Sequence, residues 1–70
     1  MRLTEATPGQ EYKISNVCTE DEEMNAFLFS LGCYSGELIT VMSKKRSGLV
    51  VSIKDGKYSI DNYLSDAIEI

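Results

Sequence analysis

Residues 28–41 constrain the fold of this 70-residue chain more than any other stretch. They read Leu-Phe-Ser-Leu-Gly-Cys-Tyr-Ser-Gly-Glu-Leu-Ile-Thr-Val, an apolar helical pattern followed by two glycines and then a strand pattern. Gly32 stands where a left-handed residue would end the helix, and Cys33 is placed to fold back on Leu28. Gly32 and Gly36 therefore fix how a helix meets a strand, and nothing in the stretch is typical of catalysis.

A helix is predicted immediately before Gly32. Thr19 and Glu22 have the spacing of a capping box, and the acidic residues 20–23 would fill a first turn that suits the positive end of the helix dipole. The apolar residues that follow have the i, i+3, i+4, i+7 spacing of one buried stripe: Met24, Phe27, Leu28 and Leu31. Phe29 lies off this stripe, so we expect it on the outer face of the helix.

About five short strands are expected around this helix, at residues 10–18, 37–43, 49–54, 57–60 and 67–70. The alternation of the first is interrupted at Asn16. A polar loop over residues 44–48 joins the second strand to the third, and Asp55 with Gly56 has the composition of a two-residue hairpin turn. The pattern indicates a mainly β protein, a small barrel, and full closure would leave no exposed sheet edge.

Length and charge narrow the class of protein. Seventy residues, 1–70, make a single domain with little interior for a deep substrate pocket. The net charge of −4 disfavours non-specific binding to nucleic acid and to anionic membranes. No apolar run is long enough to span a bilayer, and the first residues do not resemble a signal peptide, so we expect a cytoplasmic protein without membrane insertion.

No arrangement of nucleophile and base is evident, and the chain contains no histidine, so we expect no enzyme and no catalytic residue. Cys18 beside the acidic residues 20–23 could be imagined as an Fe(II) site, but a charged first helical turn explains those residues better. We therefore expect neither a metal site nor a cofactor. Cys18 and Cys33 are expected as reduced thiols.

The order of these pieces resembles the FeoA family. The run Leu31-Gly32-Cys33-Tyr34-Ser35-Gly36, followed by Ile39 and Val41, is similar to the family's Leu-Gly-x-x-x-Gly-x-x-Ile-x-Val pattern. The likeness extends upstream to Leu3 and downstream to Ile70. It implies an SH3-like barrel of about five strands, with one helix inserted after the first strand. It also implies a cytoplasmic accessory protein of ferrous iron uptake that binds the cytosolic part of a FeoB-type membrane GTPase transporter.

An exposed aromatic residue such as Phe29 is a frequent anchor at protein interfaces, and residues 44–46 form the only basic cluster of an acidic chain. The residues expected to bind or shape the surface that meets the partner are Phe29, Leu31, Gly32, Tyr34, Gly36, Lys44, Lys45 and Arg46. Two alternatives stay open: a metal-linked regulatory or interaction module acting through another protein, and, less favoured by the charge, a nucleic-acid-binding barrel. Self-association also stays open.

Overall fold

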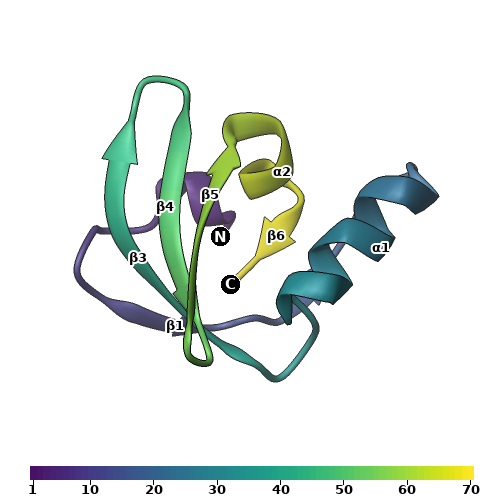
Figure 1. Ribbon diagram of the computed structural model, residues 1–70, viewed down its shortest axis with the longest axis horizontal. Coiled ribbons are helices and arrows are strands. Elements are labelled where there is room, and N and C mark those ends of the chain that lie inside the picture. The colour runs from purple at the N-terminus through teal and green to yellow at the C-terminus, as the bar shows by residue number, and fades with distance from the viewer.

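The structure is a computed structural model that describes residues 1–70 (Figure 1). Its elements follow in the order η1 (a 3-10 helix, Leu3–Glu5), β1 (Glu11–Lys13), β2 (Asn16–Val17), α1 (Glu22–Leu31), β3 (Leu38–Lys45), β4 (Gly48–Ile53), β5 (Gly56–Asp61), α2 (Asn62–Asp66) and β6 (Ile68–Glu69). Neither helix has the length and apolar character needed to cross a membrane.

Two antiparallel sheets make up the barrel. Strands β1, β3, β4 and β5 form one sheet in the order β1-β3-β4-β5, while β2 and β6 pair with each other. The buried apolar side chains of both sheets, the helices and the connecting segments form one core cluster: Leu3, Ala6, Ile14, Leu28, Cys33, Ile39, Val41, Leu49, Val51, Ile53, Ile60, Ala67 and Ile68. The expected mainly β barrel is confirmed, with one main helix that follows both β1 and β2.

The single strand expected over residues 10–18 is divided between the two sheets. The amide of Ile14 donates to the carbonyl of Glu37 at 2.8 Å, whereas the next amide, that of Ser15, donates to Glu69 in β6 at 2.8 Å. Successive amides of a strand point in opposite directions, so one extended segment can join the edges of two sheets. The interruption that the sequence shows at Asn16 therefore marks a real break, because β1 ends at Lys13 and β2 begins at Asn16 in the other sheet.

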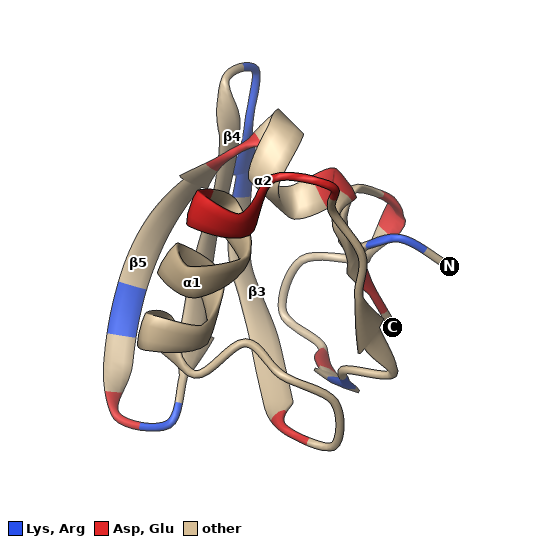
Figure 2. Ribbon diagram, turned by 90° about the vertical axis from the view of Figure 1, so that its right-hand side faces the viewer, with Lys and Arg blue, Asp and Glu red and all other residues tan.

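Helix α1 begins two residues later than the capping box predicted. Asp21 is the N-cap, and its carboxylate accepts hydrogen bonds from the amides of Glu23 at 2.9 Å and Met24 at 3.3 Å. Thr19 instead accepts from the amide of Asp21 at 3.1 Å. An ionised carboxylate is a stronger acceptor than a hydroxyl, which favours the later start. The acidic residues remain at this end of the helix (Figure 2).

The end of α1 follows the prediction. Gly32 has φ of +100°, and its amide donates to the carbonyls of Leu28 and Phe29, while Cys33 donates to Leu28 at 2.9 Å. The expected buried stripe is only partly correct, because Leu28 is the one fully buried side chain of the helix and Phe27 is 47% exposed. Helix α1 projects outward from the barrel, and its N-terminal end is the part farthest from the sheets (Figure 1).

Both hairpin turns differ from the predicted ones. Strand β3 continues to Lys45, which pairs with Gly48, so the first loop contains only residues 46–47. In the second hairpin Ile53 pairs with Gly56, and the loop residues are 54–55 in place of the predicted 55–56. Gly56 is needed for another reason: the ring of Tyr58 lies where a Cβ atom would stand.

The four-stranded sheet of the barrel does not close on itself at β5. Strand β5 pairs only with β4, which leaves its other edge without a neighbouring strand.

Candidate functional site

The residues predicted to meet a partner lie in two groups at opposite ends of the β3–β4 hairpin. Lys44 and Lys45 pair with the first residues of β4, whereas Gly32 lies against Ile53, the last residue of that strand. The six residues of β4 separate these ends by roughly 17 Å at about 3.3 Å a residue. The sequence suggested one docking surface, and the structure divides it into an aromatic and a basic part.

The first group, here called the aromatic face, consists of Phe29, Leu31, Gly32, Tyr34 and Lys54. The rings of Phe29 and Tyr34 lie 6.4 Å apart between centroids and are tilted by 38°. Phe29 is 53% exposed, as its position off the helical stripe predicted. These residues, together with the β4–β5 turn and Tyr58, line an open hollow of about 390 Å³. An open hollow with an exposed aromatic wall suits contact with another chain better than enclosure of a substrate.

Lys54 belongs to the aromatic face, and sequence reasoning missed it. Its Nζ donates a hydrogen bond to the Tyr34 hydroxyl at 2.7 Å and lies 5.2 Å from the centre of the Tyr34 ring. This hydrogen bond, and to a lesser degree the charges of Tyr34 and Glu37, raise the pKa of Lys54 above its ordinary value. Lys54 was overlooked because the turn was predicted one residue too late. Its φ of +54° is rare for a residue with a side chain.

Glycines 32 and 36 shape the segment that carries Tyr34. Both have a positive φ, +100° and +93°, which L side chains rarely adopt. At Gly32 an added Cβ would also lie 3.0 Å from Cγ2 of Ile53, so the close approach of α1 to β4 needs glycine. Gly36 has open space around it, and its amide donates to Ile14 at 2.8 Å. Both glycines therefore shape the segment that carries Tyr34, but only Gly32 also lines the hollow of the aromatic face.

The second group, the basic hairpin, consists of Lys44, Lys45 and Arg46. All three side chains are exposed, and none forms an ion pair with a carboxylate. The backbone is nevertheless held, because the amide of the Asn62 side chain donates to the carbonyl of Arg46 at 2.9 Å. The three positive charges are thus free to meet an acidic surface.

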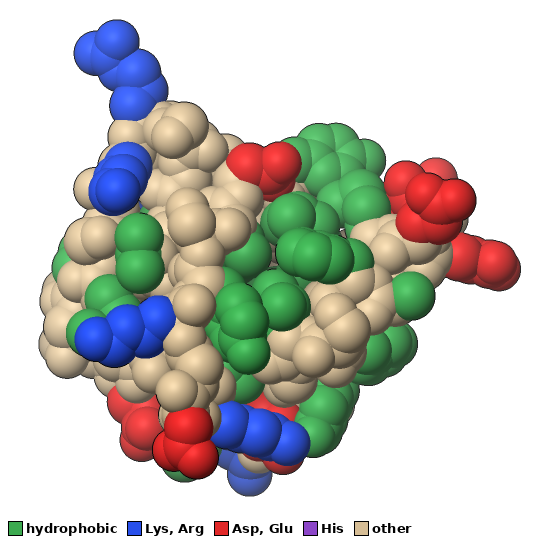
Figure 3. All heavy atoms as spheres, viewed as in Figure 1, with side chains coloured by type: hydrophobic (Ala, Val, Ile, Leu, Met, Phe, Trp, Pro, Cys, Tyr) green, Lys and Arg blue, Asp and Glu red, His purple; other side chains and the backbone are tan.

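Hydrophobic side chains also gather between β5, α1 and α2, in the centre of the face shown in Figure 3. Phe27, Ile60 and Leu64 line a hollow of about 350 Å³ there, and Phe27 borders a second one of about 290 Å³ against Tyr63 of α2. This surface could not be predicted from the sequence, since Phe27 was expected in the core.

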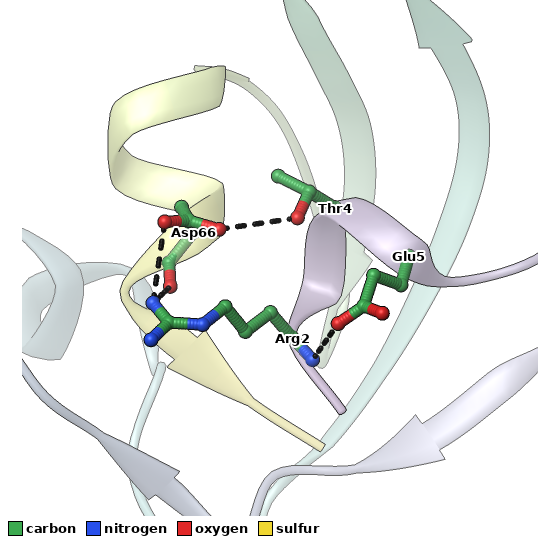
Figure 4. Close-up of polar contacts among 4 residues, drawn as sticks. All are labelled: Arg2, Thr4, Glu5 and Asp66. Atoms are coloured by element: carbon green, nitrogen blue, oxygen red, sulfur yellow. Dashed lines mark hydrogen bonds and ion pairs between the residues drawn. The ribbon is translucent and has the colours of Figure 1, made fainter.

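The acidic residues near Cys18 do not form a compact ligand set with it. No group of three His, Cys, Asp or Glu side chains comes close enough to hold a metal ion. Cys18 is exposed beside Arg2, Glu20 and Asp66. Figure 4 shows Arg2 donating from Nη1 to the Asp66 carbonyl at 3.0 Å and pairing with its carboxylate at 3.2 Å, contacts that join the N-terminal segment to α2.

This arrangement of strands and helices is the fold of a small SH3-like barrel protein. The model of the FeoA domain matches residues 1–70, and the chain therefore belongs to the FeoA family. No curated protein matches the chain.

Two solved FeoA structures share the fold. One, described as an iron uptake regulatory protein (FeoA), is 22% identical, has a TM-score of 0.87, and is aligned over 97% of this chain and 91% of its own. The other is Stenotrophomonas maltophilia FeoA complexed with zinc, described as a procaryotic SH3 domain protein possibly acting as a ferrous iron transport activating factor. It is 16% identical and has a TM-score of 0.86. The alignment covers 99% of this chain and 87% of that one.

A third structure with this fold is a manganese-dependent transcriptional repressor. It is 16% identical with a TM-score of 0.89, and the match covers 97% of this chain but only 39% of the repressor. Identities this low establish the shared fold alone.

Proposed function

We infer that this protein is an accessory factor of ferrous iron uptake that binds the cytosolic part of a FeoB-type membrane GTPase transporter. Membership of the FeoA family over residues 1–70 is the observation that carries this proposal. The description of Stenotrophomonas maltophilia FeoA as 'possibly acting as' a ferrous iron transport activating factor supports it. This function places the protein in the cytoplasm and requires no chemistry of its own.

The aromatic face is the surface we assign to this contact. Phe29 supplies an exposed ring, Tyr34 a second ring with a hydroxyl, and Lys54 a cation fixed by that hydroxyl. Aromatic residues backed by a rigid scaffold lose little conformational entropy on binding, which makes them effective anchors. The basic hairpin would steer the approach of an acidic partner from the other end of the barrel.

Binding can regulate a transporter only if the two conformations of the transporter differ in affinity for the accessory protein. The direct test is co-purification with the full-length FeoB-type transporter encoded in the same genome, in mild detergent, with and without a GTP analogue. Phe29→Ala is compared with Tyr63→Ala, because Tyr63 is also exposed, at 70%, but lies outside the aromatic face.

Nucleotide-dependent retention of the wild-type protein and of Tyr63→Ala, with loss of Phe29→Ala, is the expected result. Absence of retention under both conditions would remove the transport assignment.

A second candidate function is a metal-linked regulatory module that acts through a separate protein. The fold shared with a manganese-dependent repressor favours it over nucleic-acid binding, which the net charge of −4 opposes. Binding of this chain to a DNA-binding regulator only in the presence of Fe(II) or Mn(II) would support it.

A further inference from the structure

The open edge of β5 is the feature that the fold leaves unexplained. A strand at the edge of a sheet presents unpaired backbone N–H and C=O groups, which form a template for another strand. Native proteins usually shorten, cover or close such edges. Here β5 is a six-residue strand with β4 on one side and no strand on the other.

The hydrogen bonds of the neighbouring strands determine which groups of β5 are free. The backbone N–H and C=O groups of Val41 in β3 point toward the β1 side. The carbonyl accepts a hydrogen bond from the amide of Gly9 at 2.7 Å, and the amide donates to the carbonyl of Gln10 at 3.3 Å. The backbone N–H and C=O groups of successive strand residues point in opposite directions. Those of Thr40 therefore point toward its partner Ser52 in β4.

Since the backbone groups of Ser52 bond to β3, the backbone N–H and C=O groups of the residues on either side of it point toward β5. Val51 therefore bonds to its partner Tyr58. Lys57 and Ser59, which flank Tyr58, turn their N–H and C=O groups away from β4. None of these four groups has a hydrogen-bond partner elsewhere in the protein.

The space beside this edge is apolar and bounded by α1. Tyr58 and Ile60 point to the inner side of β5, where the hollow at one end is walled by Phe29 and Leu31 and the hollow at the other by Phe27. Figure 3 shows hydrophobic side chains over this region. Because α1 lines both hollows, the groove admits one extended segment more readily than the edge of a second folded barrel.

Charges along the edge define the chemistry of the segment. Lys57, Ser59 and Asp61 lie on the outer side of β5, all exposed. Every strand pair in the protein is antiparallel, and antiparallel pairing is slightly the more stable. An antiparallel segment then places a basic residue opposite Asp61 and an acidic one opposite Lys57, with apolar residues between them facing Tyr58 and Ile60.

We propose that the β5 edge binds an extended segment of a partner protein by strand addition, in the pattern basic, apolar, any residue, apolar, acidic. The backbone supplies the hydrogen bonds, the alternating apolar side chains fill the groove beside α1, and the two charges fix direction and register. The identity of the protein that supplies the segment rests on the function proposed above, whereas the mode of binding does not.

The test uses the full chain and a capped synthetic peptide of sequence Lys-Val-Thr-Val-Glu-Val. At a peptide concentration that occupies about nine-tenths of the sites, exchange of the Lys57 and Ser59 amides, followed by NMR, slows about tenfold, because only the free tenth exchanges. The same peptide N-methylated at its threonine has no effect, since it cannot donate to Ser59. A peptide with the two charges exchanged binds more weakly.

Two substitutions at one position serve as a matched pair. Ser59→Pro removes a free N–H and leaves the bonds to β4 in place, whereas Ser59→Ala keeps the backbone intact. Ser59→Ala binds the peptide like the wild type and Ser59→Pro does not, with circular dichroism confirming that both are folded. The proposal would be overturned if amide exchange were unchanged at millimolar peptide, or if the N-methylated peptide had the same effect as the unmodified one. It would also be overturned if protection rose with protein concentration alone, because a second copy of the chain would then occupy the edge.

The same pair separates this inference from the proposed function. If both variants are retained equally by the FeoB-type transporter, the transport role stands and strand addition is rejected for that contact. If the peptide binds at β5 but the transporter does not retain the wild-type protein, strand addition stands and another protein supplies the segment.

Discussion

Lys54 and Tyr34 join two parts of the chain that are far apart in sequence. The Lys54 Nζ donates to the Tyr34 hydroxyl at 2.7 Å, which links the β4–β5 turn to the segment that follows α1. Lys54 also has a φ of +54°, an uncommon conformation that costs on the order of 1 kcal/mol for a residue other than glycine. The hydrogen bond therefore holds both the strained turn and the half-buried ring of Tyr34 in one arrangement.

Tyr34→Phe tests this link through the pKa of Lys54. Loss of the hydroxyl removes the main cause of the raised pKa, so the value should fall toward the ordinary 10.5. A raised pKa stabilises the folded protein fully below 10.5 and loses that effect as the pH rises through the higher folded-state value. Melting temperatures of the two proteins should thus differ by a constant amount below about pH 10 and converge above it.

The measurement is an NMR titration of the Lys54 ε-methylene signals in the wild-type protein and in Tyr34→Phe. An identical Lys54 titration in wild type and variant would contradict the link.

Phe29→Ala should weaken partner binding with little effect on stability. The ring is 53% exposed and its centroid lies 6.4 Å from that of Tyr34, so the free energy of unfolding should change by less than about 1 kcal/mol. Leu28→Ala is the matched control, since its side chain is fully buried, and should cost about 2 to 5 kcal/mol. Thermal melts measure the stability of the two variants, and retention by the transporter measures their binding. A stability loss at Phe29 comparable to that at Leu28 would identify it as a core residue.

Gly32→Ala should destabilise the protein more than Gly36→Ala. Both substitutions force a side chain into a positive φ, at about 1 kcal/mol or more each. Only at Gly32 does the new Cβ also approach Ile53 Cγ2, at 3.0 Å, so the Ile53 side chain must move by a few tenths of an ångström. Urea denaturation of the two variants measures the difference. Equal losses would show that the contact with Ile53 relaxes freely.

Local features of the fold could be predicted where one residue type satisfies one physical requirement. Gly32 ended the helix as expected, because its positive φ and its amide bonds to Leu28 and Phe29 suit few other residues. The helix start was less certain from sequence, since Thr19 and Asp21 are both capping residues. Only the geometry of α1 shows that the carboxylate of Asp21 bonds to the first free amides.

Features that depend on distant contacts were not predictable. The helical period placed Phe27 on the apolar stripe, but its ring is 47% exposed and lines the open hollow that it shares with Ile60 and Leu64. The turn at residues 54–55 was predicted one residue too late, because Gly56 was interpreted as a turn glycine. Glycine is needed at position 56 because the ring of Tyr58 lies where a Cβ atom would stand. For the same reason neither the open edge of β5 nor the part of Lys54 in the aromatic face was evident from sequence.

Replacement of Lys44, Lys45 and Arg46 by serine should slow association with an acidic partner. These side chains are exposed and unpaired, so they act mainly through long-range attraction, which salt screens. The association rate should fall and its dependence on ionic strength should flatten, with dissociation little changed. Lys13→Ser, at an exposed position on β1, is the control for charge alone. An equal loss per charge removed there would show a general effect of net charge, measured by stopped-flow or surface plasmon resonance.

The two cysteines should differ strongly in reactivity. Cys18 is exposed, whereas burial of Cys33 raises the pKa of its thiol to about 11. At pH 8 about a thousandth of Cys33 is then thiolate, the reactive form, and the reagent cannot reach it without opening of the barrel. An excess of a chromogenic disulfide reagent should therefore modify one thiol rapidly and the second only as the protein unfolds. Cys18→Ser should abolish the fast phase and leave the slow one, which urea accelerates. A fast phase that persists in Cys18→Ser would mean that Cys33, and with it the packing between α1 and β4, is open to solvent in the native protein.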